Sequence, residues 1–132
     1  MYSDKDEIIE RLSEIELIDL ASETTTLDAA ALAVIVTCIE DADDEIDGYI
    51  SGRYTTPLTS PYPAMIVRIS VELAIVNLNK KRNIFSEDVL DRYKWVKDML
   101  EKIAKGTITI DVEDDASTPD RIEIQSNELR GW

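Results

Sequence analysis

The chain has 132 residues and carries 28 acidic side chains against 14 lysines and arginines, which gives a formal charge of −14. It contains no histidine and one cysteine, Cys38, so an intrachain disulfide, a cysteine-based zinc site and histidine-dependent catalysis are excluded. With 44% hydrophobic residues the chain can form one folded domain, while its longest apolar run, residues 29–36, is far shorter than the roughly 18 residues of a membrane span. We therefore expect a protein without a membrane segment or cofactor.

The charges are unevenly distributed along the chain. Residues 1–50 hold 15 acidic and 2 basic side chains, residues 51–105 hold 6 acidic and 10 basic, and residues 106–132 hold 7 acidic and 2 basic. Identical subunits with an acidic end and a basic middle can attract one another head to tail, and such a contact forms a ring if it closes. An acidic surface that only maintains solubility explains the same total charge.

A short first helix is expected near the N-terminus. Ser3 is its candidate N-cap, Asp6 and Glu7 suit the positive end of the helix, and its apolar side comprises Ile8, Ile9 and Leu12.

The second expected helix is long and follows Thr26. Its apolar residues recur at three- and four-residue steps, which is the period of one helix face. We expect it to end near Gly48 and Gly52. The apolar face comprises Leu27, Ala31, Val34, Ile35, Cys38, Ile39, Ala42, Ile46 and Tyr49.

Three of the four prolines lie between Gly52 and Pro63, which predicts an extended connector. A third helix then begins at Pro61 or Pro63. Its apolar residues are Met65, Ile66, Ile69, Leu73, Val76 and Leu78, and we expect Arg68, Glu72 and Asn79 to point away from that face. Lys80, Lys81 and Arg82 suit its negative C-terminal end.

The fourth helix has the clearest limits. Ser86 is its expected N-cap and Gly106 its end. Acidic residues near the start and basic residues near the end both favour the helix dipole. The core face comprises Val89, Tyr93, Val96, Leu100 and Ile103.

The C-terminal part changes pattern. Residues 108–112 and 121–125 each alternate apolar and polar side chains, as half-buried strands do. Because a lone hairpin is marginally stable, we expect this tail to pack on the helices or to exchange strands with a neighbouring subunit. The predicted fold is mainly α: a four-helix bundle-like domain over residues 1–106, with a β-rich tail over residues 107–132.

The segment IDGYISGRYTTPL, residues 46–58, resembles the small neck proteins, or head–tail connectors, of Mu-like phages and prophages. The resemblance extends over roughly residues 27–112 and rests on Pro63, Leu100, Ile103, Gly106 and these positions: Asp47, Tyr49, Arg53, Tyr54, Pro57, Leu58, Arg92 and Tyr93. It implies a helical virion protein that forms a homo-oligomeric ring beneath the portal protein and joins it to a tail or neck protein. It also implies that the protein is made in the bacterial host cytoplasm and ends in the virion neck. From the acidic charge we expect DNA to pass through the ring without specific binding.

The acidic segment 41–48 nearly matches a calcium-binding loop, with Asp43, Glu45, Asp47 and Gly48 at relative positions one, three, five and six. Position twelve is Tyr54, where such a loop needs a bidentate glutamate. An acidic helix face exposed to water is therefore the favoured interpretation. Scattered carboxylates alone, without a nucleophile or a glycine-rich phosphate loop, do not indicate an enzyme.

Several side chains are candidates for contacts. We expect Arg53 to interact with the negative end of the preceding helix and to pair with Asp47 or with an acidic residue of a neighbouring subunit, and Tyr54 to pack on the proline-rich connector. A structural role for both residues is favoured over direct contact with a partner. Trp95 lies beside the main apolar face of its helix, which suits either an interface or a wide core. The basic run of Lys80, Lys81 and Arg82 lacks interleaved aromatic residues, so helix capping is favoured over contact with DNA.

Two functions from different classes remain open at this point. The first is the head–tail adaptor ring. The alternative is an acidic DNA mimic that occupies the basic groove of a DNA-binding enzyme, because closely spaced carboxylates imitate phosphates. The basic middle of the chain, residues 51–105, counts against a mimic.

Overall fold

The computed structural model describes residues 1–110, which contain five α-helices and no strand. The helices are α1 (Lys5–Arg11), α2 (Glu14–Ala21), α3 (Ala29–Ile50), α4 (Ala64–Lys81) and α5 (Glu87–Lys105). The mainly α class and the four expected helices are confirmed. The predicted number of four helices was wrong, because α2 was not predicted.

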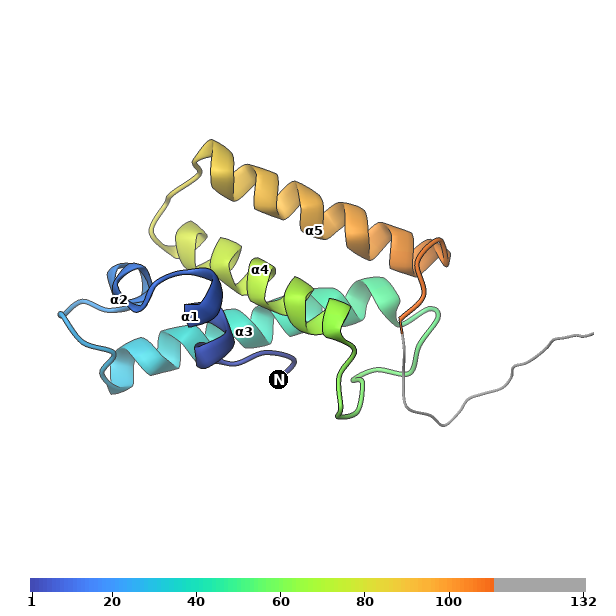
Figure 1. Ribbon diagram of the computed structural model, residues 1–132, viewed down its shortest axis with the longest axis horizontal. Coiled ribbons are helices and arrows are strands. Elements are labelled where there is room, and N and C mark those ends of the chain that lie inside the picture. Colours follow the sequence, from blue (N-terminus) through green and yellow to red (C-terminus); the bar gives the residue numbers. More distant parts are fainter. Residues whose placement is uncertain (111–132) are drawn as a thin grey trace, which may run out of the picture.

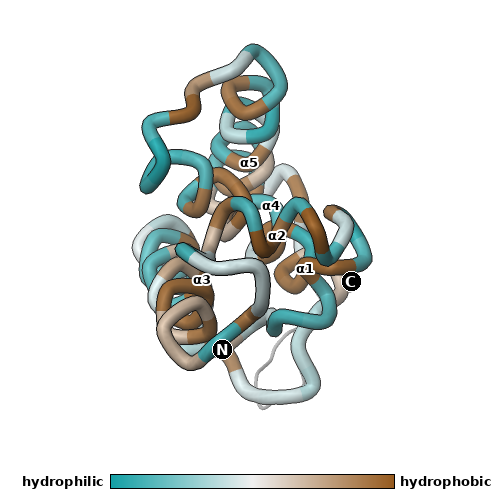
Figure 2. Tube along the Cα trace, turned by 90° about the vertical axis from the view of Figure 1, so that its left-hand side faces the viewer, coloured by the Kyte–Doolittle hydropathy of each residue, from teal (hydrophilic) through white to brown (hydrophobic). Residues whose placement is uncertain are grey.

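The three long helices form the body of the domain. In Figure 1, α3 and α5 run in the same direction and α4 runs between them in the opposite direction, with α1 and α2 at one side of this layer. Viewed along the long axis, α5 lies above, α3 at the lower left, α2 near the centre, and α1 below it on the right (Figure 2). Residues far apart in the sequence thus share one core.

Helix α4 is the centre of that core, with neighbours on all sides. Its apolar residues are not confined to one face, and Ile66, Leu73 and Leu78 are fully buried. A helix surrounded in this way also buries polar residues, and here it buries Ser70, Glu72 and Asn79. The expectation that Glu72 and Asn79 point away from the core was therefore wrong.

Helices α1 and α2 depend on local capping. Asp4, not Ser3, is the N-cap of α1, and its carboxylate accepts from the Glu7 N–H in a capping box. Ser13 and Glu16 form the same reciprocal pair at the start of α2. Each capping box pairs backbone N–H groups that would otherwise lack a partner at the beginning of a short helix.

Helix α3 ends between Gly48 and Gly52, as predicted. It ends at Ile50, so Gly48 lies inside the helix, and Gly52 lies beyond its C-cap residue. The buried face matches the expected face and includes Ile35, Ile39 and Ile46, each at most 1% exposed.

The end of α5 packs against the connector between α3 and α4. Gly106 ends the helix with a φ of +83°. Residues other than glycine rarely adopt this left-handed backbone conformation. A β-carbon built on Gly106 would lie 2.8 Å from the guanidinium carbon of Arg53. Any larger residue at this position would therefore both strain the backbone and displace Arg53.

The predicted strand over 108–112 is not formed in its described part. Residues 108–110 lack strand conformation. Ile110 is buried, and its N–H donates to the Tyr54 hydroxyl at 3.3 Å. The rest of that strand, the second strand and most of the 107–132 tail lie outside the described residues. Over residues 1–110, no helix is both long and apolar enough to cross a bilayer.

Candidate functional site

A buried carboxylate connects three helices at the centre of the domain. Glu72 of α4 has a side chain only 8% exposed. It accepts from Arg11 of α1 at 2.7 Å and from Arg92 of α5 at 2.6 Å. Each carboxylate oxygen thus has its own charged donor, which offsets the cost of removing Glu72 from water. Arg92 also pairs with Asp88 at 3.3 Å.

The local electrostatics of Arg92 favour its charged form. Burial alone would lower the pKa of this guanidinium, but ion pairing with Glu72 and hydrogen bonding to Asp88 raise it above its ordinary value. Arg92, one of the residues that carry the resemblance, therefore contributes to packing between helices. The sequence signal for a buried role of Glu72 was that it is a single acidic residue in an otherwise apolar helix. Its partners could not be predicted, because Arg11 and Arg92 lie on helices that are distant in sequence.

The N-terminal residues are anchored to α3 through two aspartates of the calcium-like segment. The Tyr2 hydroxyl donates to Asp47 at 2.6 Å, and the Tyr2 N–H donates to Asp43 at 2.7 Å. Asp43 also accepts from the Ser70 hydroxyl of α4 at 2.8 Å, and Ser70 bonds to Ser3. We call the contacts made by Tyr2 and Ser3 the N-terminal anchor.

This anchor corrects the interpretation of the acidic segment. The segment is helical, as favoured above, but Asp43 and Asp47 bind the N-terminus rather than face water. Burial raises the pKa of Asp43 in spite of its hydrogen bonds from Tyr2 and Ser70. Burial and the Asp47 carboxylate raise the pKa of Tyr2, so its hydroxyl remains a donor. Within residues 1–110, no three acidic or cysteine side chains are grouped so that they could hold a metal ion.

The connector residues of the resemblance lie close to this anchor. Leu58 is buried, and its N–H donates to the Tyr2 hydroxyl at 2.8 Å. Pro57 is exposed and Tyr54 packs against the core. The expected ion pair between Arg53 and Asp47 is not present among the described residues, because Asp47 accepts from Tyr2 and Arg53 lies against Gly106.

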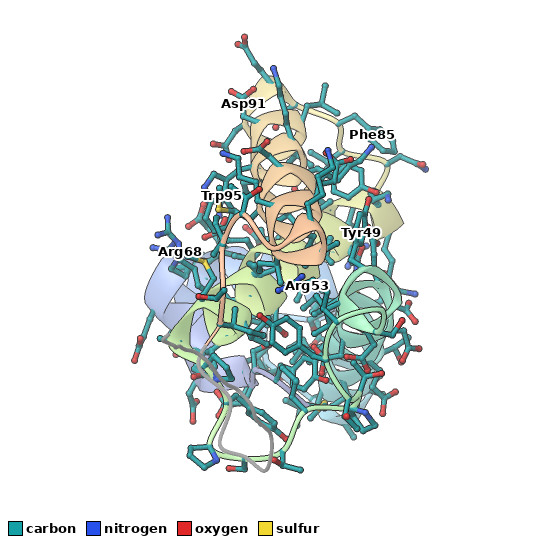
Figure 3. All side chains as sticks on the ribbon, turned by 90° about the vertical axis from the view of Figure 1, so that its right-hand side faces the viewer. Tyr49, Arg53, Arg68, Phe85, Asp91 and Trp95 are labelled. Carbon is teal, nitrogen blue, oxygen red and sulfur yellow. The ribbon has the colours of Figure 1, made fainter. Side chains whose placement is uncertain are left out.

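Tyr93 lies on the side of α5 that faces α3. Its hydroxyl donates to Glu45 at 3.2 Å, and burial together with Glu45 raises its pKa. The ammonium groups of Lys80 and Lys97 lie 5.0 and 5.5 Å from the centre of its ring. Tyr49 and Phe85 lie on this same side of the molecule (Figure 3). Tyr93 therefore joins α3, α4 and α5 beside a basic and apolar surface.

Trp95 lies on the opposite side, beside Arg68 (Figure 3). It is half-buried, and the Arg68 guanidinium lies 4.6 Å from its ring centre. Arg68 thus covers part of the ring through a cation–π contact. Contact of Trp95 with another protein stays a prediction.

The basic run at the C-terminal end of α4 caps helices in two different ways. Lys80 and Lys81 lie in the last turn of α4, as expected from the helix dipole. The side chain of Arg82 instead caps α2, donating to the carbonyl oxygens of Leu20 at 2.9 Å and Ser22 at 2.8 Å. Arg82 thus connects a helix that was not predicted to the end of α4.

We expect Cys38 to resist alkylation in the native protein. It is 1% exposed, and burial raises the pKa of its thiol from 9.0 to about 11. This shift alone lowers the reactive thiolate fraction about a hundredfold at neutral pH. Iodoacetamide labelling followed by mass spectrometry, with and without urea, measures the effect. Equal labelling rates in the two conditions would contradict the packing around Cys38.

The chain is similar in sequence to proteins of Mu-like phages and prophages. A family model described as Bacteriophage Mu, Gp36 matches residues 2–126. The Mu-like prophage FluMu protein gp36 of Haemophilus influenzae is 32% identical over 120 residues, which cover 89% of this chain and 81% of that protein. The chain belongs to the phage Mu Gp36 family.

Membership in the Gp36 family confirms the Mu-like part of the resemblance. The match also includes the N-terminal region, residues 2–26, where no resemblance was found above. That region contains Tyr2 and Arg11. The roles of these two residues were not identified from the sequence, because neither belongs to a recognisable motif. Neither description names an enzymatic activity. The adaptor role and its partners remain predictions.

Proposed function

We propose that this Gp36-family chain is a virion structural protein that forms a ring under the portal protein and joins the phage head to the tail. Its buried polar residues support a structural role, because the groups around Glu72 and Tyr2 connect helices to one another. The charged groups on the surface supply the means of association.

The observation that carries this proposal is the uneven surface charge. Helix α3 contains six acidic residues and no basic one, whereas Lys80, Lys94 and Lys97 are exposed on α4 and α5. None of these three lysines forms an ion pair within residues 1–110. Opposite charges on different faces of one subunit favour contacts between subunits, and they interrupt the continuous acidic surface that a DNA mimic needs.

Head–tail joining in a phage extract tests the proposal. We expect a phage that lacks this gene to accumulate DNA-filled heads and separate tails, and the purified chain to restore joined, infectious particles. Electron microscopy and plaque counts measure the result, with denatured chain as control. Joined particles in the absence of the chain would refute the adaptor role. Normal particles with altered sensitivity to a host nuclease would favour the DNA mimic.

A further inference from the structure

The surface beside Tyr93 combines exposed apolar side chains with lysines. Phe85 and Leu90 are 55% and 54% exposed, although both residue types are usually buried. Leu90, Lys94 and Lys97 line an open hollow along α5, together with Asp91, Tyr93, Trp95, Asp98 and Glu101. We call Phe85, Leu90, Lys94 and Lys97 the α5 surface.

Two lysines and three acidic residues line this hollow. Asp98 is paired with Lys102 at 3.1 Å, whereas Lys94, Lys97, Asp91 and Glu101 form no ion pair in the part of the chain that the structure describes. Lys97 lies over the ring of Tyr93, which holds its ammonium group beside the hollow. The α5 surface is therefore apolar at the start of the helix and carries two unpaired lysines further along, with Asp91 and Glu101 beside them.

On the outer side of α3, exposed apolar residues are also followed by charged residues, but here the charged residues are acidic. Leu32 and Val36 are each 38% exposed, and they are followed by the exposed acids Glu40 and Asp44. These four residues are spaced four apart, so they lie along one side of the helix. We call them the α3 surface. Neither acid forms an ion pair within residues 1–110.

We propose that the α5 surface binds the α3 surface of a second copy of this chain, with the two helices parallel. This proposal rests on the proposed ring and identifies its subunit contact. Val36 would lie near Leu90, Glu40 near Lys94, and Asp44 near Lys97. The spacing agrees, since Val36 to Asp44 and Leu90 to Lys97 span about 12 Å and about 10.5 Å at 1.5 Å per residue.

The arrangement of helices within one subunit supports a parallel contact. Helices α3 and α5 run in the same direction (Figure 1), and rotation about an axis along the helices preserves that direction in the next subunit. The α3 surface of one copy then meets the α5 surface of the next. Each subunit uses two different faces, as a closed ring requires.

Gly48 provides an independent indication of a close approach. It continues the four-residue spacing of the α3 surface and is exposed, and an added β-carbon would meet no atom from another part of residues 1–110 within 4 Å. A glycine inside a helix costs about 1 kcal/mol relative to alanine, and no contact within residues 1–110 requires it. A neighbouring helix that comes close to the backbone at this position explains it.

Charge exchange between the two surfaces tests the contact. Lys94→Glu with Lys97→Glu, and Glu40→Lys with Asp44→Lys, should each weaken self-association about tenfold or more, because each places like charges in contact. The variant with all four changes restores opposite charges and should recover association to within about threefold of the unmodified chain. Sedimentation and head–tail joining measure both effects, and circular dichroism checks folding.

Matched controls place the same charge changes elsewhere. Glu10→Lys with Asp19→Lys alters exposed acids of α1 and α2, and Lys5→Glu with Lys105→Glu alters lysines away from the α5 surface. These variants should associate like the unmodified chain. If they lose association as strongly as the test variants, or if the four-change variant folds but does not recover, the proposed contact is wrong.

Direct cross-linking separates this contact from the adaptor role. In an equal mixture of ¹⁴N- and ¹⁵N-labelled full chains, a carbodiimide should join Lys94 or Lys97 to Glu40 or Asp44 in peptides that contain both labels. Head–tail joining without these mixed peptides would overturn the contact and leave the adaptor role intact. Mixed peptides without joining would support the contact and count against the adaptor role.

Discussion

Leu100→Ala is expected to lower the free energy of unfolding by about 2–5 kcal/mol, the range measured for buried leucines. Leu100 is completely buried in α5, in the core that α5 shares with α3 and α4. The truncation removes apolar contacts and leaves a cavity that the long, well-packed helices cannot easily close. Urea denaturation followed by circular dichroism gives the difference in unfolding free energy.

Leu90→Ala is the matched control, because it makes the same chemical change in the same helix at a side chain that is 54% exposed. Its expected effect is within about 0.5 kcal/mol, as for other surface substitutions. Equal losses for the two variants would contradict the orientation of α5. A loss of association without a loss of stability in Leu90→Ala would agree with the proposed subunit contact.

Glu72→Gln is expected to lower the free energy of unfolding by about 3 kcal/mol. The substitution preserves the size of the side chain but leaves Arg11 and Arg92 without their shared carboxylate, and breaking a buried ion pair typically costs about 3–5 kcal/mol. We expect the lower end of this range because the side chains of Arg11 and Arg92 are 40% and 24% exposed, so both retain some access to water. Urea denaturation at neutral pH measures the loss.

Asp88→Asn is the control for this prediction. It removes a different carboxylate that also pairs with Arg92, but the Asp88 side chain is 78% exposed, and such surface pairs contribute at most about 1 kcal/mol. If Asp88→Asn were as destabilising as Glu72→Gln, the stabilising contribution of Arg92 would depend on Asp88 as much as on Glu72. A neutral Glu72→Gln would show that the connection between α1, α4 and α5 depends on apolar packing alone.

Local signals predicted most of the helical body. Ser86 and Gly106 mark the limits of α5 in the sequence and in the structure, because capping acts between residues that are neighbours in the chain. The same periodic spacing correctly placed Ile35, Ile39 and Ile46 on the buried face of α3. Helix α2 was missed because eight residues carry too little periodicity, although its capping box at Ser13 and Glu16 is visible in the sequence.

The roles of the polar residues were not predictable from local pattern. Glu72 seemed suited to an outer face, yet it is buried because α1, α3 and α5 surround α4 on different sides. Asp47 was matched with Arg53, which is near it in sequence, but its actual donor is Tyr2, 45 positions away. Arg82 was assigned to its own helix and instead caps α2.

The sequence by itself determined the helical class, the limits of the long helices and the uneven charge, since these depend on residue type and short-range spacing. The tertiary structure decided which charges are neutralised inside the subunit and which remain on its surface. Glu72, Asp43 and Asp47 find donors within the chain, whereas Glu40, Asp44, Lys94 and Lys97 form no ion pair within residues 1–110. The physical reason is that a charged side chain reaches only groups that packing brings within a few ångströms, and packing joins segments that are far apart in the sequence.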